Sequence, residues 1–314
     1  MTKLNKKIKT ALDESRILVL GSQIVLGFQF RAFFEKSFAT MTDQSRYLQL
    51  GGLFLLLASI GLLMWPSSYH RLVRGGEDAS DIHSFTTSVM NIALLPVVFV
   101  FTIDIYLVTS RVWGTFSGIA SGVSVGAIAL FWYGLGLISR RRHWDADVAK
   151  VRKVKEKGEM QPTPISDKVE QVLTEARMVL PGAQALLGFQ FATMLMETFQ
   201  TLPSASQYVH AASLICIGIS VILLMTPAAY HRIVERGEDT DHFHTVASAL
   251  VVGAMVSLPI GICSELYVVL RRLTERQDFA VGTAVLALMF FYSLWFGVTG
   301  YKRIRRGSTR NTHD

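Results

Sequence analysis

Long uncharged apolar stretches alternate with short polar segments along most of this chain. A helix rises about 1.5 Å per residue, so about twenty apolar residues are enough to cross a hydrocarbon layer of about 30 Å. Such stretches occur at Tyr47–Tyr69, Ser84–Ile103, Val112–Ser139, Met178–Met196, His210–Tyr230, Thr245–Ser264 and Phe279–Tyr301. Because they are apolar on nearly every face, the pattern predicts membrane-spanning helices.

The chain also repeats itself at a constant spacing of 161 residues. Leu12–Phe30 reappears as Leu173–Phe191 with ten of nineteen positions identical, and Met64–Asp78 returns as Met225–Asp239. This repeat indicates a tandem duplication. We predict a first four-helix membrane repeat at 1–142, a charged cytoplasmic linker at 143–168, and a second four-helix repeat with a basic tail at 169–314.

One further span is interrupted by a charge. The stretch Ile17–Phe34 contains Arg31, but the equivalent position in the second copy is Ala192, and that stretch is uncharged. We therefore predict eight transmembrane helices and an all-α integral membrane bundle. Since each copy holds an even number of spans, the two copies enter the membrane in the same direction and form parallel repeats.

Basic residues are distributed unevenly between the two predicted sides of the membrane. If the N-terminus is cytoplasmic, 24 of the 31 Lys and Arg residues lie in cytoplasmic segments and six lie in outside loops. This bias follows the positive-inside rule and predicts that both termini are cytoplasmic. We interpret the net charge of +7 as contact with anionic lipid headgroups, and we expect no nucleic-acid partner.

Ionisable residues within predicted spans are the first candidates for function. Asp104 and Glu265 place an acid at the same position in the third span of each copy. Charges at membrane depth are costly, so they usually face the interior and find partners. Two arrangements remain open: the acids pair with Arg111 and Arg272 near the outer interface, or they lie in the interior and serve a function.

Arg31 suggests a specific pairing for one of these acids. It falls in the outer half of the first span, at a depth similar to that of Asp104, so we hypothesise an Arg31–Asp104 ion pair. Ala192 replaces the arginine in the second copy. The hypothesis therefore leaves Glu265 unpaired and makes it a candidate proton site.

The predicted cytoplasmic loops carry a second duplicated cluster. Its members are Tyr69, His70, Arg71, Glu77 and Asp78, matched by Tyr230, His231, Arg232, Glu238 and Asp239. One interpretation is structural, with arginines anchored at the headgroups and acids capping the third span. The other is a gating or binding role, with Glu14 and Glu175 approaching the same level.

Glutamines recur within the first span of each copy, as Gln23 and Gln29 and then as Gln184 and Gln190. Amides in hydrocarbon usually form hydrogen bonds between helices. Such residues can also line the path of a solute, and both interpretations stay open.

The motifs Leu12-Asp-Glu-Ser-Arg16, Gly27-Phe-Gln-Phe30 and Tyr69-His-Arg71 resemble a family of small bacterial four-helix membrane proteins of unknown function. The second copy departs from the pattern at Thr174. The resemblance implies a bacterial inner-membrane protein, here duplicated in tandem, and implies no activity.

The sequence contains no nucleophile triad context, no HExxH, no phosphate-binding loop and no cysteine-based metal spacing. We therefore predict no enzyme, metal or cofactor. The leading hypothesis is movement of a small solute or ion past Arg31, Asp104 and Glu265. The competing one is a non-transporting scaffold, sensor or stress protein that binds a partner through its cytoplasmic loops. A homo-oligomer is compatible with either.

Overall fold

The computed structural model describes residues 3–74, 80–113, 118–119, 122–123, 126–127 and 164–302, and the regular structure in these ranges is helical. This confirms the predicted all-α class for the described part. Glu77 and Asp78 lie outside the described residues. So do most of the first copy's fourth span, most of the predicted linker, and the tail from residue 303.

Helix boundaries repeat at the spacing of the sequence duplication. The first copy comprises α1 (Lys3–Ala32), the 3-10 turn η1 (Lys36–Thr40), α2 (Asp43–Arg74) and α3 (Ser80–Trp113). The second comprises α6 (Ile165–Met194), the short α7 (Glu197–Gln200), α8 (Ser204–Ile233), α9 (Asp241–Thr274), α10 (Gln277–Tyr292) and the π-helical turn η4 (Ser293–Gly297). Shifted by 161 residues, α2 and α8 begin at equivalent positions, and α3 and α9 share both ends. The duplicated sequence therefore forms duplicated helices.

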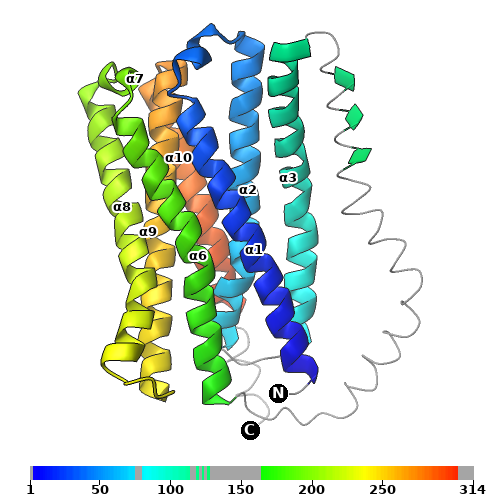
Figure 1. Ribbon diagram of the computed structural model, residues 1–314, viewed down its shortest axis with the longest axis vertical. Coiled ribbons are helices and arrows are strands. Elements are labelled where there is room, and N and C mark those ends of the chain that lie inside the picture. The colour runs from blue at the N-terminus through cyan, green and yellow to red at the C-terminus, as the bar shows by residue number, and fades with distance from the viewer. Residues whose placement is uncertain are drawn as a thin grey trace.

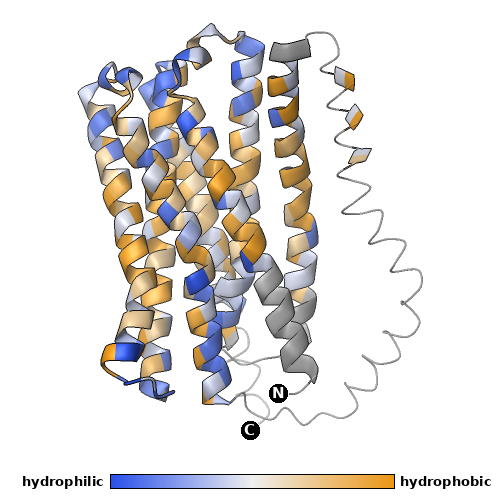
Figure 2. Ribbon diagram, viewed as in Figure 1, coloured by the Kyte–Doolittle hydropathy of each residue, from blue (hydrophilic) through white to orange (hydrophobic). Residues whose placement is uncertain are grey.

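Five helices are long and apolar enough to cross a membrane: α2, α3, α8, α9 and α10. Hydrophobic residues dominate the middle of these helices, and hydrophilic residues gather toward the ends of the bundle (Figure 2). These helices identify the chain as a membrane protein. α1 and α6 are not among the five, because each begins with a charged segment and carries several polar residues.

The two copies share one core. α1 and α6 lie side by side, and each also packs against the second and third helices of its own copy (Figure 1). The end of the last helix crosses to the first copy, where η4 packs against α2. There the indole Nε1 of Trp295 donates a hydrogen bond to the backbone oxygen of Gly61 over 2.8 Å.

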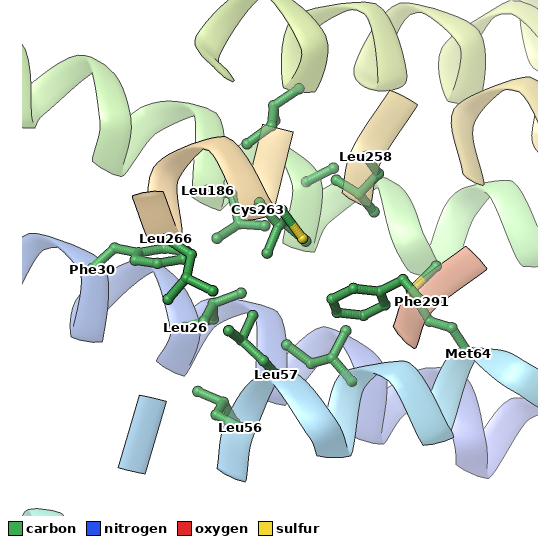
Figure 3. Packing of buried hydrophobic residues seen from close by; sticks show 14 of the residues in the cluster. Leu26, Phe30, Leu56, Leu57, Met64, Leu186, Leu258, Cys263, Leu266 and Phe291 are labelled. Carbon is green, nitrogen blue, oxygen red and sulfur yellow. The ribbon is translucent and has the colours of Figure 1, made fainter. Parts of the chain in front are cut away.

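Side chains from both copies interdigitate at the centre of this core (Figure 3). They come from α1, α2, α6, α9 and α10 and are almost fully buried: Leu26, Phe30, Leu56, Leu57, Met64, Leu186, Leu258, Cys263, Leu266 and Phe291. At this level of the bundle the copies are therefore joined by close apolar packing.

Glycines let α1 and α6 approach each other closely. A Cβ on Gly27 would lie 2.1 Å from the ring of Phe189, and a Cβ on Gly182 would lie 1.9 Å from Oε1 of Gln23. Neither position has room for a side chain without movement of its neighbour. Gly188, the equivalent of Gly27, has open space around it. The same motif therefore has different packing roles in the two copies.

The Tyr-His-Arg triplets lie in helices, which corrects the prediction that they belong to loops. α2 continues past Pro66 to Arg74, and α8 continues past Pro227 to Ile233. Proline is tolerated inside helices of membrane bundles because neighbouring groups satisfy the freed backbone. Glu238 and Asp239 do lie in the loop between α8 and α9.

Candidate functional site

A network of buried polar side chains joins three helices of the second copy. Glu265 on α9 is 1% exposed, and its Oε2 lies 2.8 Å from Nδ1 of His210 on α8. Gln190 on α6 donates from Nε2 to Glu265 Oε2 over 3.2 Å and to Ser213 Oγ over 2.5 Å. The side chains of His210, Gln190 and Ser213 are also fully buried. We call these four residues the His–Glu site.

Small residues bring α8 and α9 close enough to form this site. Ser213 lies one turn after His210, and its hydroxyl donates to the backbone oxygen of Gly261 over 2.7 Å. Gly261 precedes Glu265 by one turn, and a Cβ there would lie 2.5 Å from the side chain of Ile217. The close contact of the two helices therefore directs His210 toward Glu265.

The hydrogen bonds assign a proton to the contact between His210 and Glu265. Nε2 of His210 lies 3.0 Å from the backbone oxygen of Gln190, which can only accept, so Nε2 carries a hydrogen. The short contact between Nδ1 and the carboxylate then needs one proton, on the nitrogen or on the oxygen. The pair is neutral overall in both arrangements. It can therefore hold a single exchangeable proton inside an apolar bundle.

The first copy holds a simpler version of this site. Nε2 of Gln29 donates to Oδ1 of Asp104 over 3.3 Å, which matches the contact between Gln190 and Glu265. The position of His210 is taken by Gln49, and that of Ser213 by Gly52. Asp104 is only half-buried. Within the described residues, the first copy therefore keeps the glutamine–acid contact, with an amide in place of the histidine.

The predicted ion pair between Arg31 and Asp104 is wrong. Arg31 lies in the last turn of α1, is 43% exposed, and pairs with Glu35 over 3.2 Å. An arginine at a helix end can reach the polar boundary and a nearby carboxylate, which is favoured over burial at membrane depth. Asp104 instead takes its hydrogen bond from Gln29.

Glu265 lies in the interior and has a partner, in contrast to the unpaired acid that we expected. Arg272 does not reach it, because its guanidinium contacts the backbone oxygen of Thr198 and the ring of Phe34. The side chain of Arg111 lies outside the described part, so the same alternative for Asp104 stays untested. Sequence reasoning missed His210, although a histidine at the start of an apolar span was a visible signal.

A second buried polar cluster lies at the other end of α1 and α6. Nη2 of Arg16 is 3.1 Å from Oε1 of Glu175, and Nη2 of Arg71 contacts Oε2 of the same carboxylate. Nη1 of Arg71 also donates to Oγ of Ser248 over 2.8 Å, and Nδ1 of His70 lies 3.9 Å from Glu175. We call Arg16, Arg71 and Glu175 the Arg–Glu cluster. It joins α1, α2, α6 and α9.

Among the described side chains, the duplicated residues of the second copy form no equivalent cluster. Arg177 and Arg232 are exposed, whereas Arg16 is 2% exposed. His231 instead lies 3.4 Å from Asp239, and the hydroxyl of Tyr230 lies 3.2 Å from Nε2 of His242. The side chain of Glu14 is outside the described ones. Tyr69 is buried against the ring of Phe85, and Glu238 is exposed.

A cavity of about 20 Å³, enough for about one water molecule, lies beside the Arg–Glu cluster. Arg16, Glu175 and apolar residues of both copies line it, including Val19 and Val179. Gln23 lies one turn beyond Val19 on α1, fully buried, and its two amide atoms have no hydrogen-bond partner in the described part. Its repeat equivalent Gln184 is exposed.

Comparison with known families accounts for the duplication. The model of the family of unknown function DUF6328 matches residues 1–136 and again residues 161–299. The chain belongs to this family. No curated protein and no solved structure matches it. The resemblance inferred from the sequence motifs is confirmed, and the chain is a tandem pair of the family's domain.

Proposed function

We propose that this protein moves protons across a bacterial inner membrane, through the His–Glu site of the second copy. The observation that carries the proposal is the contact between His210 and Glu265, which is fully buried within a bundle of apolar helices. Ionisable groups at such depth are costly, and they mark proton and ion pathways more often than structural contacts.

Polar groups along α1 and α6 support a route toward this site. Glu175 and Gln190 are buried polar residues at different levels of α6. The cavity lies beside Glu175. Gln23, one turn beyond the cavity-lining Val19 on α1, packs against Gly182 of α6. Beyond Gln23 the apolar side chains of Leu26, Leu186 and Leu266 close the core (Figure 3). On this proposal, a proton can pass only when these side chains move.

The test is proton flux into proteoliposomes that contain a pH-sensitive dye. Glu265→Gln keeps the size and the hydrogen-bonding atoms of the side chain but removes the exchangeable carboxyl proton. We expect it to abolish flux, whereas Asp104→Asn in the first copy retains most of it. The melting temperature of each variant in detergent controls for folding. Equal flux in wild type and Glu265→Gln would remove the proposal.

The second candidate is a scaffold or sensor that transports nothing and binds a partner through its cytoplasmic segments. The small cavity and the closed packing around Leu26 favour it. The same liposomes separate the two functions, because a scaffold gives no more flux than empty vesicles across a range of pH gradients and voltages.

We further propose eight spans in two repeats of the same orientation, with both termini cytoplasmic. Support comes from the equivalent helix boundaries, from α1 and α6 running in the same direction (Figure 1), and from the 24 basic residues in the predicted cytoplasmic segments. A reporter fused after Gly307 should be cytoplasmic, and one inserted between η1 and α2 should be periplasmic. A periplasmic reporter after Gly307 contradicts this topology.

A further inference from the structure

Three aromatic rings surround the ammonium group of Lys302, near the end of α2 and the start of α3. Its Nζ lies 5.6 Å from the ring centre of Trp65, 5.0 Å from that of Tyr69 and 4.8 Å from that of Phe85. Each distance is within the range of a cation–π interaction. We call Trp65, Tyr69 and Phe85 the aromatic cage.

The cage is built by the packing of α2 on α3. Trp65 and Tyr69 are one turn apart on α2, and Phe85 from α3 contacts both of them. The rings of Trp65 and Phe85 meet edge to face at 4.8 Å and 86°. The three rings are therefore held together by contacts with one another as well as with Lys302.

Lys302 differs from the other cations that lie over rings in the described part. Arg46 lies over Phe38 alone, and Arg272 over Phe34 alone. Those single contacts are typical of side chains resting on a surface. Three ring faces around one ammonium group are instead the arrangement that recognises quaternary and methylated ammonium ions, because the attraction needs no hydrogen bond.

We propose that the aromatic cage is a binding site for a substituted ammonium ion, and that Lys302 occupies it as a tethered competitor. The tether gives Lys302 a high effective concentration at the cage, so an external cation must displace it. The site belongs to the first copy alone, since Thr226 and Val246 stand at the positions of Trp65 and Phe85. The proposal is independent of proton movement.

Calorimetric titration with tetramethylammonium tests the site in the purified full chain. Lys302→Gln removes the competitor and leaves the rings, so we expect it to bind tetramethylammonium about tenfold more tightly than wild type, which matches the strength of a partly desolvated cation–π contact. The double variant Lys302→Gln with Phe85→Leu should lose this gain. Lys36→Gln, which removes a distant exposed lysine, should bind like wild type.

Two results would overturn the proposal. One is that Lys302→Gln binds tetramethylammonium no more tightly than wild type, including the case in which neither binds. The other is that the double variant binds as tightly as Lys302→Gln alone while its melting temperature shows that it is folded. In place of Phe85→Leu, Trp65→Leu gives a second test if the first variant fails to fold.

Binding measurements in lipid nanodiscs distinguish two sources of the ammonium group, a lipid headgroup and a free ion. If lipid headgroups use the cage, Lys302→Gln binds tetramethylammonium more weakly in phosphatidylcholine than in phosphatidylethanolamine discs of the same net charge, because the quaternary choline headgroup competes. If the ligand is a free ion, the affinity is the same in both lipids. In both cases Lys302→Gln still binds more tightly than wild type.

Discussion

The two copies place equivalent residues in equivalent helices, yet among the described residues the second copy alone brings a histidine onto the acid of its third helix. Gln29 and Asp104 correspond to Gln190 and Glu265, and both pairs are joined by a hydrogen bond from the amide. The copies differ at the neighbouring α2 and α8 positions, where Gln49 and Gly52 stand in place of His210 and Ser213. The duplicated helices thus keep the glutamine–acid contact in both copies, and the second copy adds a histidine to it.

In the Arg–Glu cluster, by contrast, most of the ionisable residues come from the first copy. There the first copy supplies both arginines from buried positions, and the second supplies only the carboxylate of Glu175. The equivalent arginines of the second copy are exposed. In the described side chains the two copies therefore differ at both ends of the bundle, and matched substitutions in the two copies can test this difference.

The largest difference in stability is expected between substitution of Arg71 and substitution of its repeat equivalent Arg232. Arg71→Gln leaves the buried carboxylate of Glu175 with one charged partner fewer and should lower the free energy of unfolding by about 3 kcal/mol. Arg232→Gln changes an exposed side chain and should have an effect within about 0.5 kcal/mol. Unfolding in detergent with increasing SDS measures both. Similar losses in the two variants would show that the burial of Arg71 has no energetic consequence.

The next largest difference in stability is expected between substitution of Glu265 and substitution of Asp104. Glu265→Leu leaves Nδ1 of His210 and the amide of Gln190 buried without their acceptor, and should cost about 2 kcal/mol of stability. Asp104→Leu removes one hydrogen bond at a half-buried site and should cost less than about 1 kcal/mol. The same SDS titration applies, and a larger loss for Asp104→Leu would contradict the assignment of the ionisable site to the second copy.

A smaller effect, with opposite signs in the two copies, is expected at Gly27 and Gly188. Gly27→Ala forces the ring of Phe189 to move and should destabilise the protein by about 1 kcal/mol. Gly188→Ala adds a methyl group in open space, where the higher helix propensity of alanine should leave stability unchanged or raise it. Melting temperatures in detergent distinguish the two, and equal shifts would contradict the close α1–α6 crossing.

The smallest effect is expected at Lys36 and Glu197, equivalent positions of the two copies that form an exposed ion pair over 2.5 Å. The hydrogen bond and charge of Lys36 hold the pKa of Glu197 below its usual value. The pair thus adds stability above the pKa of an unfolded glutamate and loses it as the pH falls through the lowered pKa. In Lys36→Gln, an NMR titration should show that the pKa of Glu197 rises, while Lys36→Arg keeps it low.

Several features of this molecule can be recognised in the sequence. The spacing of 161 residues, the apolar stretches and the Gly-Phe-Gln-Phe motif are local or periodic properties, and the helices and the family follow from them. The equivalence of Asp104 and Glu265 was visible for the same reason. Helix ends were predicted less well, since the Tyr-His-Arg triplets were assigned to loops but lie within α2 and α8.

Partner choice depends on packing between distant segments. Glu265 meets a histidine 55 residues earlier in the chain, and Arg71 meets a carboxylate 104 residues later. Similar depth in the membrane suggested Arg31 as the ion-pair partner of Asp104. Arg31 lies at the end of α1, however, and its side chain pairs with Glu35 instead. Equivalent side chains become buried or exposed according to which helices cover them. That arrangement depends on close contacts such as Gly27 with Phe189, which no local pattern records.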